Sequence, residues 1–93
     1  MIRSVRDKRT LALRRGEPPK GVPGDVAKRA VMKLFMLDTV TRLEDLRVPP
    51  GNRLEALSGD RAGQHSIRVN DQWRLCFVWR DGDAHDVELI DYH

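Results

Sequence analysis

The chain has 93 residues, which suffice for one domain with a modest hydrophobic core, so we expect a single domain over residues 1–93. Its net charge of +3 is ordinary for a small soluble domain, but the excess is mostly arginine and is compatible with an anionic partner. A single cysteine, Cys76, excludes an internal disulfide, and the lack of a long apolar stretch predicts neither a membrane span nor a signal peptide, which favours the cytoplasm.

The first 24 residues predict a weak strand, a short helix and a loop. Residues 1–5 alternate only loosely between apolar and polar side chains. Asp7 is placed to cap a helix that buries Leu11 and ends at Gly16. Residues 17–24, EPPKGVPG, carry three prolines and two glycines, which neither a helix nor a central strand tolerates.

A long amphipathic helix is predicted from Asp25 to about Val40. Its apolar side chains recur at helical spacing, and basic side chains occupy the other side. The apolar positions are Val26, Ala27, Ala30, Val31, Leu34, Leu37 and, beyond the helix, Leu43. Met32, Phe35 and Met36 widen the apolar face, and we interpret them as core, or as a surface that faces a partner, rather than as a cofactor site.

After the break at residues 47–53, RVPPGNR, the chain has the pattern of a sheet. Four apolar stretches are separated by turn-forming residues: RLEALSG, QHSIRVN, WRLCFVWR and AHDVELIDY. The predicted fold is therefore α+β, with two N-terminal helices packed on one face of a small mixed, mostly antiparallel sheet.

The last hairpin has two candidate registers. A two-residue loop at 81–82 would place Trp73 opposite Ile90 and would bury acids with the apolar face. A three-residue loop at 80–82 gives the pairs Trp73–Leu89, Leu75–Val87 and Arg74–Glu88. We favour the three-residue loop, which places Arg74 and Tyr92 together on the face of the sheet that carries no helix.

An arginine, a tyrosine and a histidine on one sheet face are groups that RNA cleavage uses. They supply a fixed cation for the charge that grows on phosphorus and a group that transfers a proton near neutral pH. The three histidines are well separated, and no His/Cys cluster or Gly-rich phosphate loop is present, so the sequence predicts no common metal or nucleotide site. Taken alone, His93 also fits a frayed strand end, and Arg74 fits a cross-strand partner of Glu88.

Residues 46–93, from LRVPPGNR to VELIDYH, together with MIRSVRDK at the start, resemble the HigB branch of the RelE/ParE toxins of bacterial toxin-antitoxin operons. The resemblance implies a small endoribonuclease that cuts mRNA on the 70S ribosome without a metal or cofactor. It also implies a helix-turn-helix antitoxin of the HigA type, which would connect the toxin to operator DNA, and a fold of two helices against a mixed sheet.

The resemblance also assigns roles to individual residues. Arg74, in NDQWRLCF, matches the family's phosphate-binding arginine, and the DYH motif supplies a catalytic acid, phenol and imidazole from Asp91, Tyr92 and His93. RNA binding is expected from Arg53, Arg61, Arg68 and Asn70. The sequence departs from the family pattern where other members have His, Lys and Arg, since it has Glu55, Ser58 and Asn70. Glu55 is a candidate general base, although an exposed strand glutamate is more often only solvated.

These departures leave other functions open. The chain could be a catalytically weak binding module that acts as an antitoxin partner and operon co-repressor. A poison of DNA gyrase, as in the related ParE toxins, is less consistent with the DYH motif. We favour mRNA cleavage, in which Arg74 grips the RNA backbone, His93 or Asp91 helps to remove the 2′-OH proton, and Tyr92 stacks on a base or orients it.

Overall fold

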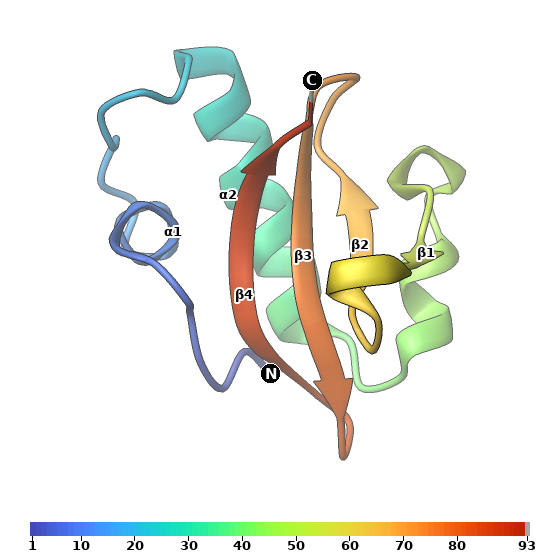
Figure 1. Ribbon diagram of the computed structural model, residues 1–93. Coiled ribbons are helices and arrows are strands. Elements are labelled where there is room, and N and C mark those ends of the chain that lie inside the picture. The colour runs from blue at the N-terminus through green and yellow to red at the C-terminus, as the bar shows by residue number, and fades with distance from the viewer. Residues whose placement is uncertain (93) are drawn as a thin grey trace.

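The structure, a computed structural model, describes residues 1–92. Two helices and a four-stranded antiparallel sheet of order β1-β2-β3-β4 make up the fold (Figure 1). The bounds are α1 Lys8–Arg14, α2 Gly24–Thr39, β1 Glu55–Ala56, β2 His65–Arg68, β3 Trp73–Arg80 and β4 Asp83–Asp91. Three short 3-10 helices, η1 Leu43–Arg47, η2 Pro50–Asn52 and η3 Gly59–Arg61, lie in the connections. The predicted fold class is confirmed.

The N-terminal segment runs along the outer edge of β4. Parallel bridges join Ile2 to Ala84 and Val5 to Val87, so the weak strand predicted for residues 1–5 is present as two isolated bridges. It adds the parallel component to an otherwise antiparallel sheet. The edge of the longest strand is thereby covered, which protects it from pairing with another chain.

Helix α1 begins as predicted but buries a different leucine. The Asp7 carboxylate accepts a hydrogen bond from the Thr10 backbone N–H, 3.2 Å away, which caps the helix. Gly16, with a φ of 78°, follows the helix end. The prediction that Leu11 is buried is wrong, because Thr10 and Leu13, three residues apart on one helical face, point into the protein and Leu11 lies half-buried beside them.

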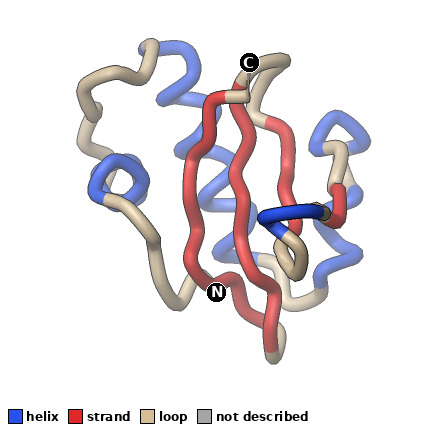
Figure 2. The backbone as a smooth tube through the Cα atoms, in the orientation of Figure 1, coloured by secondary structure: helices blue, strands red, loops and turns tan. Residues whose placement is uncertain are grey.

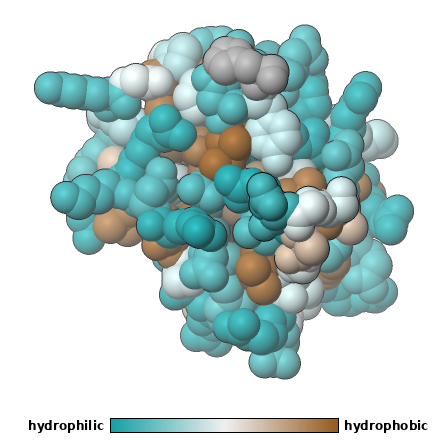
Figure 3. All heavy atoms as spheres, viewed as in Figure 1, coloured by the Kyte–Doolittle hydropathy of each residue, from teal (hydrophilic) through white to brown (hydrophobic). Residues whose placement is uncertain are grey.

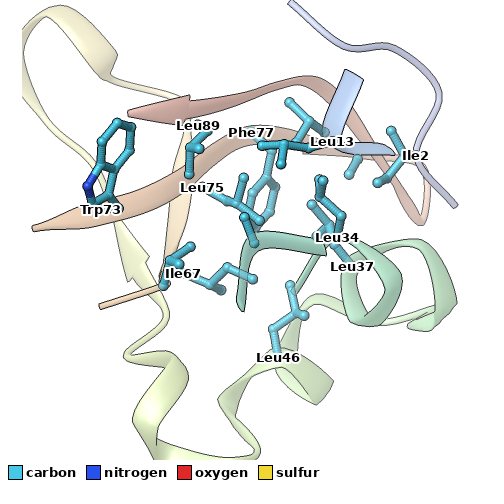
Figure 4. Close-up of a cluster of buried hydrophobic side chains, with 14 of the residues drawn as sticks. Ile2, Leu13, Leu34, Leu37, Leu46, Ile67, Trp73, Leu75, Phe77 and Leu89 are labelled. Carbon is cyan, nitrogen blue, oxygen red and sulfur yellow. The ribbon is translucent and has the colours of Figure 1, made fainter. Parts of the chain in front are cut away.

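Helix α2 covers one face of the sheet and supplies most of the helical core (Figure 2). Four of its side chains are buried: Val26, Ala30, Leu34 and Leu37. In Figure 4, Leu34 and Leu37 lie close to Leu75 and Phe77 of the sheet. The predicted helix is confirmed, but the core interpretation is wrong for Met32 and Phe35, which are 69% and 73% exposed. Their places in the helical repeat put them on the outer side of α2, away from the sheet, whereas Met36 packs against the core.

The β3–β4 hairpin closes with two residues, so the predicted three-residue loop is wrong. Arg80 pairs with Asp83, and the loop residues Asp81 and Gly82 have φ of 54° and 80°, as a type I′ turn requires. Further along, a β-bulge near Asp86, whose φ is 52°, shifts the register. Beyond it the pairs are Leu75–Leu89, Arg74–Ile90 and Trp73–Asp91, two residues away from the prediction.

The predicted faces of the hairpin are nevertheless confirmed. A shift of two residues returns each side chain to the same side of the sheet. The buried side therefore holds Trp73, Leu75, Phe77, Val87 and Leu89. The bulge also explains how a two-residue loop avoids burying acids, because Asp86 occupies the bulge and is exposed. The opposite side, which we call the open face, carries Arg74.

Candidate active site

Arg74 is held firmly on the open face. Its Nε donates to Ser66 Oγ at 2.8 Å, and its Nη2 donates to the carbonyl oxygen of Arg53 at 2.7 Å. Both partners are uncharged, so they hold the guanidinium in position without neutralising its positive charge. Its side chain is only 13% exposed, which removes much of the surrounding water. The result is a preorganised cation of the kind that stabilises a reacting phosphate.

Glu55 is the one acid recorded in an ion pair with Arg74 among residues 1–92. Its Oε2 lies 3.9 Å from Arg74 Nη2, and its side chain is 58% exposed. At this distance and exposure the ion pair adds little stability. Glu55 pairs with Ser66 in the ladder between β1 and β2, so it belongs to the same part of the open face. The candidate general base therefore lies beside the candidate phosphate ligand.

Tyr92 shares the open face with Arg74, as predicted. Its hydroxyl lies 3.6 Å from Cys76 Sγ, and its backbone N–H donates to the Gln72 carbonyl at 2.5 Å. Cys76 is two residues after Arg74 in β3 and so lies on the same side of the sheet. Burial, followed by the contact with Cys76, raises the pKa of the Tyr92 phenol. The phenol is therefore neutral at physiological pH and is available as a hydrogen-bond donor.

The Asp91 side chain points to the side of the sheet opposite to the open face. It pairs with Trp73 in the ladder, and directly paired residues point to the same side, so Asp91 has the orientation of buried Trp73 rather than that of Arg74. Its Oδ1 accepts a hydrogen bond of 3.0 Å from Gln72 Nε2. Asp91 thus lies at the end of the sheet rather than on the open face. His93, the third residue of the DYH motif, lies outside the described residues.

Arg61 lies over the open face but already has acceptors of its own. It belongs to η3, which crosses in front of the sheet in Figure 1. Its Nη1 is 3.2 Å from Glu88 Oε1 and 3.1 Å from Gln64 Oε1. Glu88, which the sequence suggested as a partner for Arg74, therefore binds Arg61 instead. Figure 3, which views the protein from this side, shows a mostly hydrophilic surface interrupted by apolar atoms.

Arg68 is paired with Arg74 in the ladder between β2 and β3, but its guanidinium is engaged elsewhere. Arg68 is ion-paired with Asp71 at 2.5 Å and lines a hollow of about 310 Å³ together with Arg29 and Lys33 of α2. Burial, followed by the charges of Arg68 and Arg29, lowers the pKa of Lys33. This hollow is a second basic surface, and Arg74 is not among the residues that line it.

Arg53 and Asn70 have backbone or turn roles in the structure. Arg53, whose φ is 43°, contributes its carbonyl to Arg74 while its side chain is exposed. Asn70 Oδ1 accepts from the backbone N–H groups of Gln72 and Trp73, at 2.9 Å and 2.8 Å. Its side chain thus closes the turn between β2 and β3.

Sequence reasoning missed three partners of the site: Ser66, Gln72 and Cys76. Ser66 and Cys76 are found only once strands are paired, because they face each other across β2 and β3. The alternation of WRLCFVWR already places Cys76 on the side of Arg74, and that signal was available. The contact of Gln72 with Asp91 depends on the observed register of β4 and could not be read from the chain.

Within residues 1–92, no three His, Cys, Asp or Glu side chains are grouped so that they could hold a metal ion. None of the helices there is long and apolar enough to cross a membrane.

Comparison with known proteins gives the family. Residues 11–93 match the family described as the RelE-like toxin of type II toxin-antitoxin system HigB. The chain belongs to this family of toxins. As a HigB toxin of a type II system, it has an antitoxin as its partner.

Two relatives support the assignment to HigB. The chain is 34% identical over 93 residues, 100% of both chains, to the Endoribonuclease HigB of Proteus vulgaris. It is 48% identical over 68 residues to Toxin HigB-1 of Vibrio cholerae, which covers 73% of this chain and 72% of that one.

A solved structure agrees with the fold. The YoeB-YefM complex from Staphylococcus aureus contains a chain that superposes with a TM-score of 0.57 at 16% identity, and the match covers 100% of this chain and 98% of that chain. At this identity the likeness concerns the fold alone.

Proposed function

We propose that this HigB toxin is an endoribonuclease that cuts mRNA on the translating ribosome without a metal or cofactor. The observation that carries the proposal is the position of Arg74, which is fixed by Ser66 and Arg53 on the open face that also carries the neutral phenol of Tyr92. The name of the Proteus vulgaris relative, Endoribonuclease HigB, which aligns over the whole chain, supports RNA cleavage. Cytoplasmic location follows from the substrate.

The reaction uses the RNA's own 2′-OH as nucleophile. The 2′ oxygen forms a bond to the adjacent phosphorus, the bond from phosphorus to the 5′ oxygen breaks, and the products are a 2′,3′-cyclic phosphate and a 5′-OH. A base takes the 2′-OH proton, and an acid returns a proton to the leaving 5′ oxygen. Arg74 stabilises the negative charge on the phosphate oxygens in the transition state.

The geometry of the described residues limits which side chains can transfer the protons. Tyr92, with its raised pKa, is a poor base at neutral pH and is assigned to stacking on a base or to donating a hydrogen bond. Asp91 points away from the face of Arg74, so it is the weakest of the candidate bases. Imidazoles in general have a pKa near 6.5, which suits proton transfer at neutral pH. His93, which supplies an imidazole, and Glu55 beside Arg74 remain as the candidate proton carriers. We assign the base role first to His93.

The partner is proposed to be an antitoxin of the HigA type, with a helix-turn-helix domain through which the toxin is connected to operator DNA. Its docking surface is the apolar outer side of α2, where Val31, Met32 and Phe35 are exposed. Two hollows, of about 590 and 640 Å³, flank these side chains. Exposed apolar side chains grouped in this way are typical of an interaction site.

A weak nuclease that acts mainly as antitoxin partner and operon co-repressor is the second candidate. The observation that favours it is the carboxylate of Glu55, which lies 3.9 Å from Arg74 where a phosphate would bind. The position of Asn70, whose side-chain oxygen closes a turn, is consistent with fewer RNA contacts. A Glu55→Gln variant tests the second candidate, because it raises cleavage if Glu55 repels phosphate and lowers cleavage if Glu55, rather than His93, is the base.

The test is inducible expression in cells that lack the antitoxin, followed by mapping of mRNA 5′ ends. We expect cuts within translated codons, 5′-OH ends and growth arrest. The His93→Ala variant should lose most of this activity and still bind the antitoxin. Intact mRNA with normal growth contradicts nuclease function. Full toxicity of His93→Ala moves proton transfer to Glu55 or Asp91.

A further inference from the structure

The outer edge of β4 is bonded to the first ten residues of the chain almost along its whole length. Ala84 accepts from the N–H of Arg3 at 2.8 Å and donates to the Met1 carbonyl at 3.0 Å. Val87 accepts from the N–H of Arg6 at 2.9 Å and donates to the Ser4 carbonyl at 3.1 Å. The backbone groups that these two residues direct to the outer edge therefore have partners in the N-terminal segment.

At Leu89 the partner changes from backbone to side chains. Thr10 Oγ1 accepts a hydrogen bond of 2.9 Å from the Leu89 N–H, and Arg9 Nη2 donates one of 2.7 Å to the Leu89 carbonyl. Both side chains come from α1, which lies beside β4 in Figure 1. Helix α1 thus covers the edge of β4 at Leu89, the last residue before Asp91 whose backbone N–H and C=O point to that edge. We call Arg9 and Thr10 the α1 clamp.

Arg9 also contacts the strand next to β4. Its guanidinium carbon lies 5.2 Å from the centre of the Trp73 ring, in a cation–π arrangement. Trp73 pairs with Asp91 in the sheet, so Arg9 contacts the β3 residue at the same level as the site. Its Nε is buried and has no hydrogen-bond partner among residues 1–92. A buried donor without a partner is unfavourable, so stability alone does not account for an arginine in this place.

We propose that Arg9 and Thr10 are positioning residues for RNA cleavage, which fix the end of β4 so that Tyr92 lies beside Arg74. The inference rests on the proposed nuclease function of the same site. Leu89 is two residues before Asp91 and three before Tyr92, so a shift at Leu89 is transmitted directly to both. A displacement of about 1 Å at a reacting group can cost on the order of 100-fold in rate.

Thr10 offers a matched pair of variants. Thr10→Val keeps the shape of the buried side chain but removes the acceptor of the Leu89 N–H, whereas Thr10→Ser keeps the hydroxyl. Arg9→Met keeps an unbranched stem over Trp73 and removes the donor to Leu89. Leu46→Ala is the stability control, because Leu46 is fully buried in η1, away from β4.

Two measurements are made on the full chain, each well below the melting temperature of the variant. Cleavage of mRNA on programmed ribosomes should show a fall in kcat of roughly 10- to 100-fold for Thr10→Val and Arg9→Met, with KM nearly unchanged. Thr10→Ser and Leu46→Ala should stay within about threefold of the wild type. Amide hydrogen exchange should speed up at Leu89 and Tyr92 in Thr10→Val and remain slow at Leu75.

The outcomes separate the clamp from the function. Wild-type kcat in Thr10→Val, or an equal loss in Leu46→Ala, overturns the positioning role while the nuclease function stands. A wild-type chain that cuts no mRNA overturns the proposed function. In that case amide exchange decides whether the clamp fixes the end of β4, since unchanged exchange at Leu89 and Tyr92 in Thr10→Val overturns it.

Discussion

Replacing Arg74 tests the centre of the proposed site. The Arg74→Ala variant removes the hydrogen bonds to Ser66 Oγ and to the Arg53 carbonyl. A typical hydrogen bond contributes about 0.5–1.5 kcal/mol, so the two together contribute about 1–3 kcal/mol to the free energy of unfolding. A small domain has roughly 5–15 kcal/mol in total, so we expect the variant to fold with a lower melting temperature.

The loss of activity should be larger than the loss of stability. Removal of one preorganised donor to a developing anion costs about 10²- to 10³-fold in rate, or roughly 2.7–4 kcal/mol. Arg74→Lys should lie between the wild type and Arg74→Ala. A lysine keeps the charge but has a single nitrogen at its tip, which cannot bond to Ser66 and Arg53 and still present a planar pair of donors to phosphate.

The assay is single-turnover cleavage of mRNA on programmed ribosomes, with thermal unfolding measured on the same preparations. Arg80→Ala is the matched control, because Arg80 is an exposed arginine at the far end of the same strand. It removes the same charge without touching the site and should cleave at nearly the wild-type rate. Arg74→Ala activity within about threefold of wild type, or an equal loss in Arg80→Ala, would refute the role given to Arg74.

Four further predictions follow from the packing, the surface and the pKa values. Trp73→Ala should lower the free energy of unfolding by about 3–5 kcal/mol in a denaturant titration, because the ring is 5% exposed. Tyr92→Phe should keep most cleavage activity, since stacking survives the loss of the hydroxyl. Phe35→Glu should weaken antitoxin binding at least tenfold in calorimetry and leave cleavage unchanged. The hydrogen bond from Arg3 lowers the pKa of Asp83, so this acid stabilises the fold above its unfolded pKa of about 3.9 and loses that contribution as the pH falls through its lower folded value. Acid unfolding of Asp83→Asn should therefore depend less on pH below about pH 4.

The helices and strands could be predicted from the sequence where the hydrophobic pattern repeats over many residues. Sixteen residues of α2 repeat the helical pattern several times, and the eight-residue strand β3 alternates clearly. The hairpin register was wrong for two reasons: the loop has two residues instead of three, and Asp86 adopts a left-handed conformation and forms a bulge. Aspartate tolerates that conformation, but the chain offers many aspartates, so its place in a bulge was not marked.

The candidate site was predictable only in part for a related reason. The face that Arg74 and Tyr92 share depends on parity, which a two-residue register shift preserves. The contacts of Arg74 with Ser66 and Arg53 depend instead on how β2 and the η2 turn approach β3, which no local pattern fixes. The same holds for Arg68. It is paired with Arg74 across β2 and β3, yet its guanidinium is ion-paired with Asp71 and lines the hollow beside α2.

The sheet separates the two surfaces that the toxin uses in our proposals. Helix α2 lies behind the sheet in Figure 1, with Phe35 on its outer side, whereas Arg74 belongs to the face that carries no helix. A partner bound on the outer side of α2 therefore does not need to touch Arg74. An antitoxin in this position would leave the open face free for a small RNA. It would therefore inhibit the toxin through its bulk, which keeps the toxin out of the ribosome. In these proposals each side of the sheet meets a different partner, so exposed apolar side chains on α2 are compatible with a hydrophilic open face.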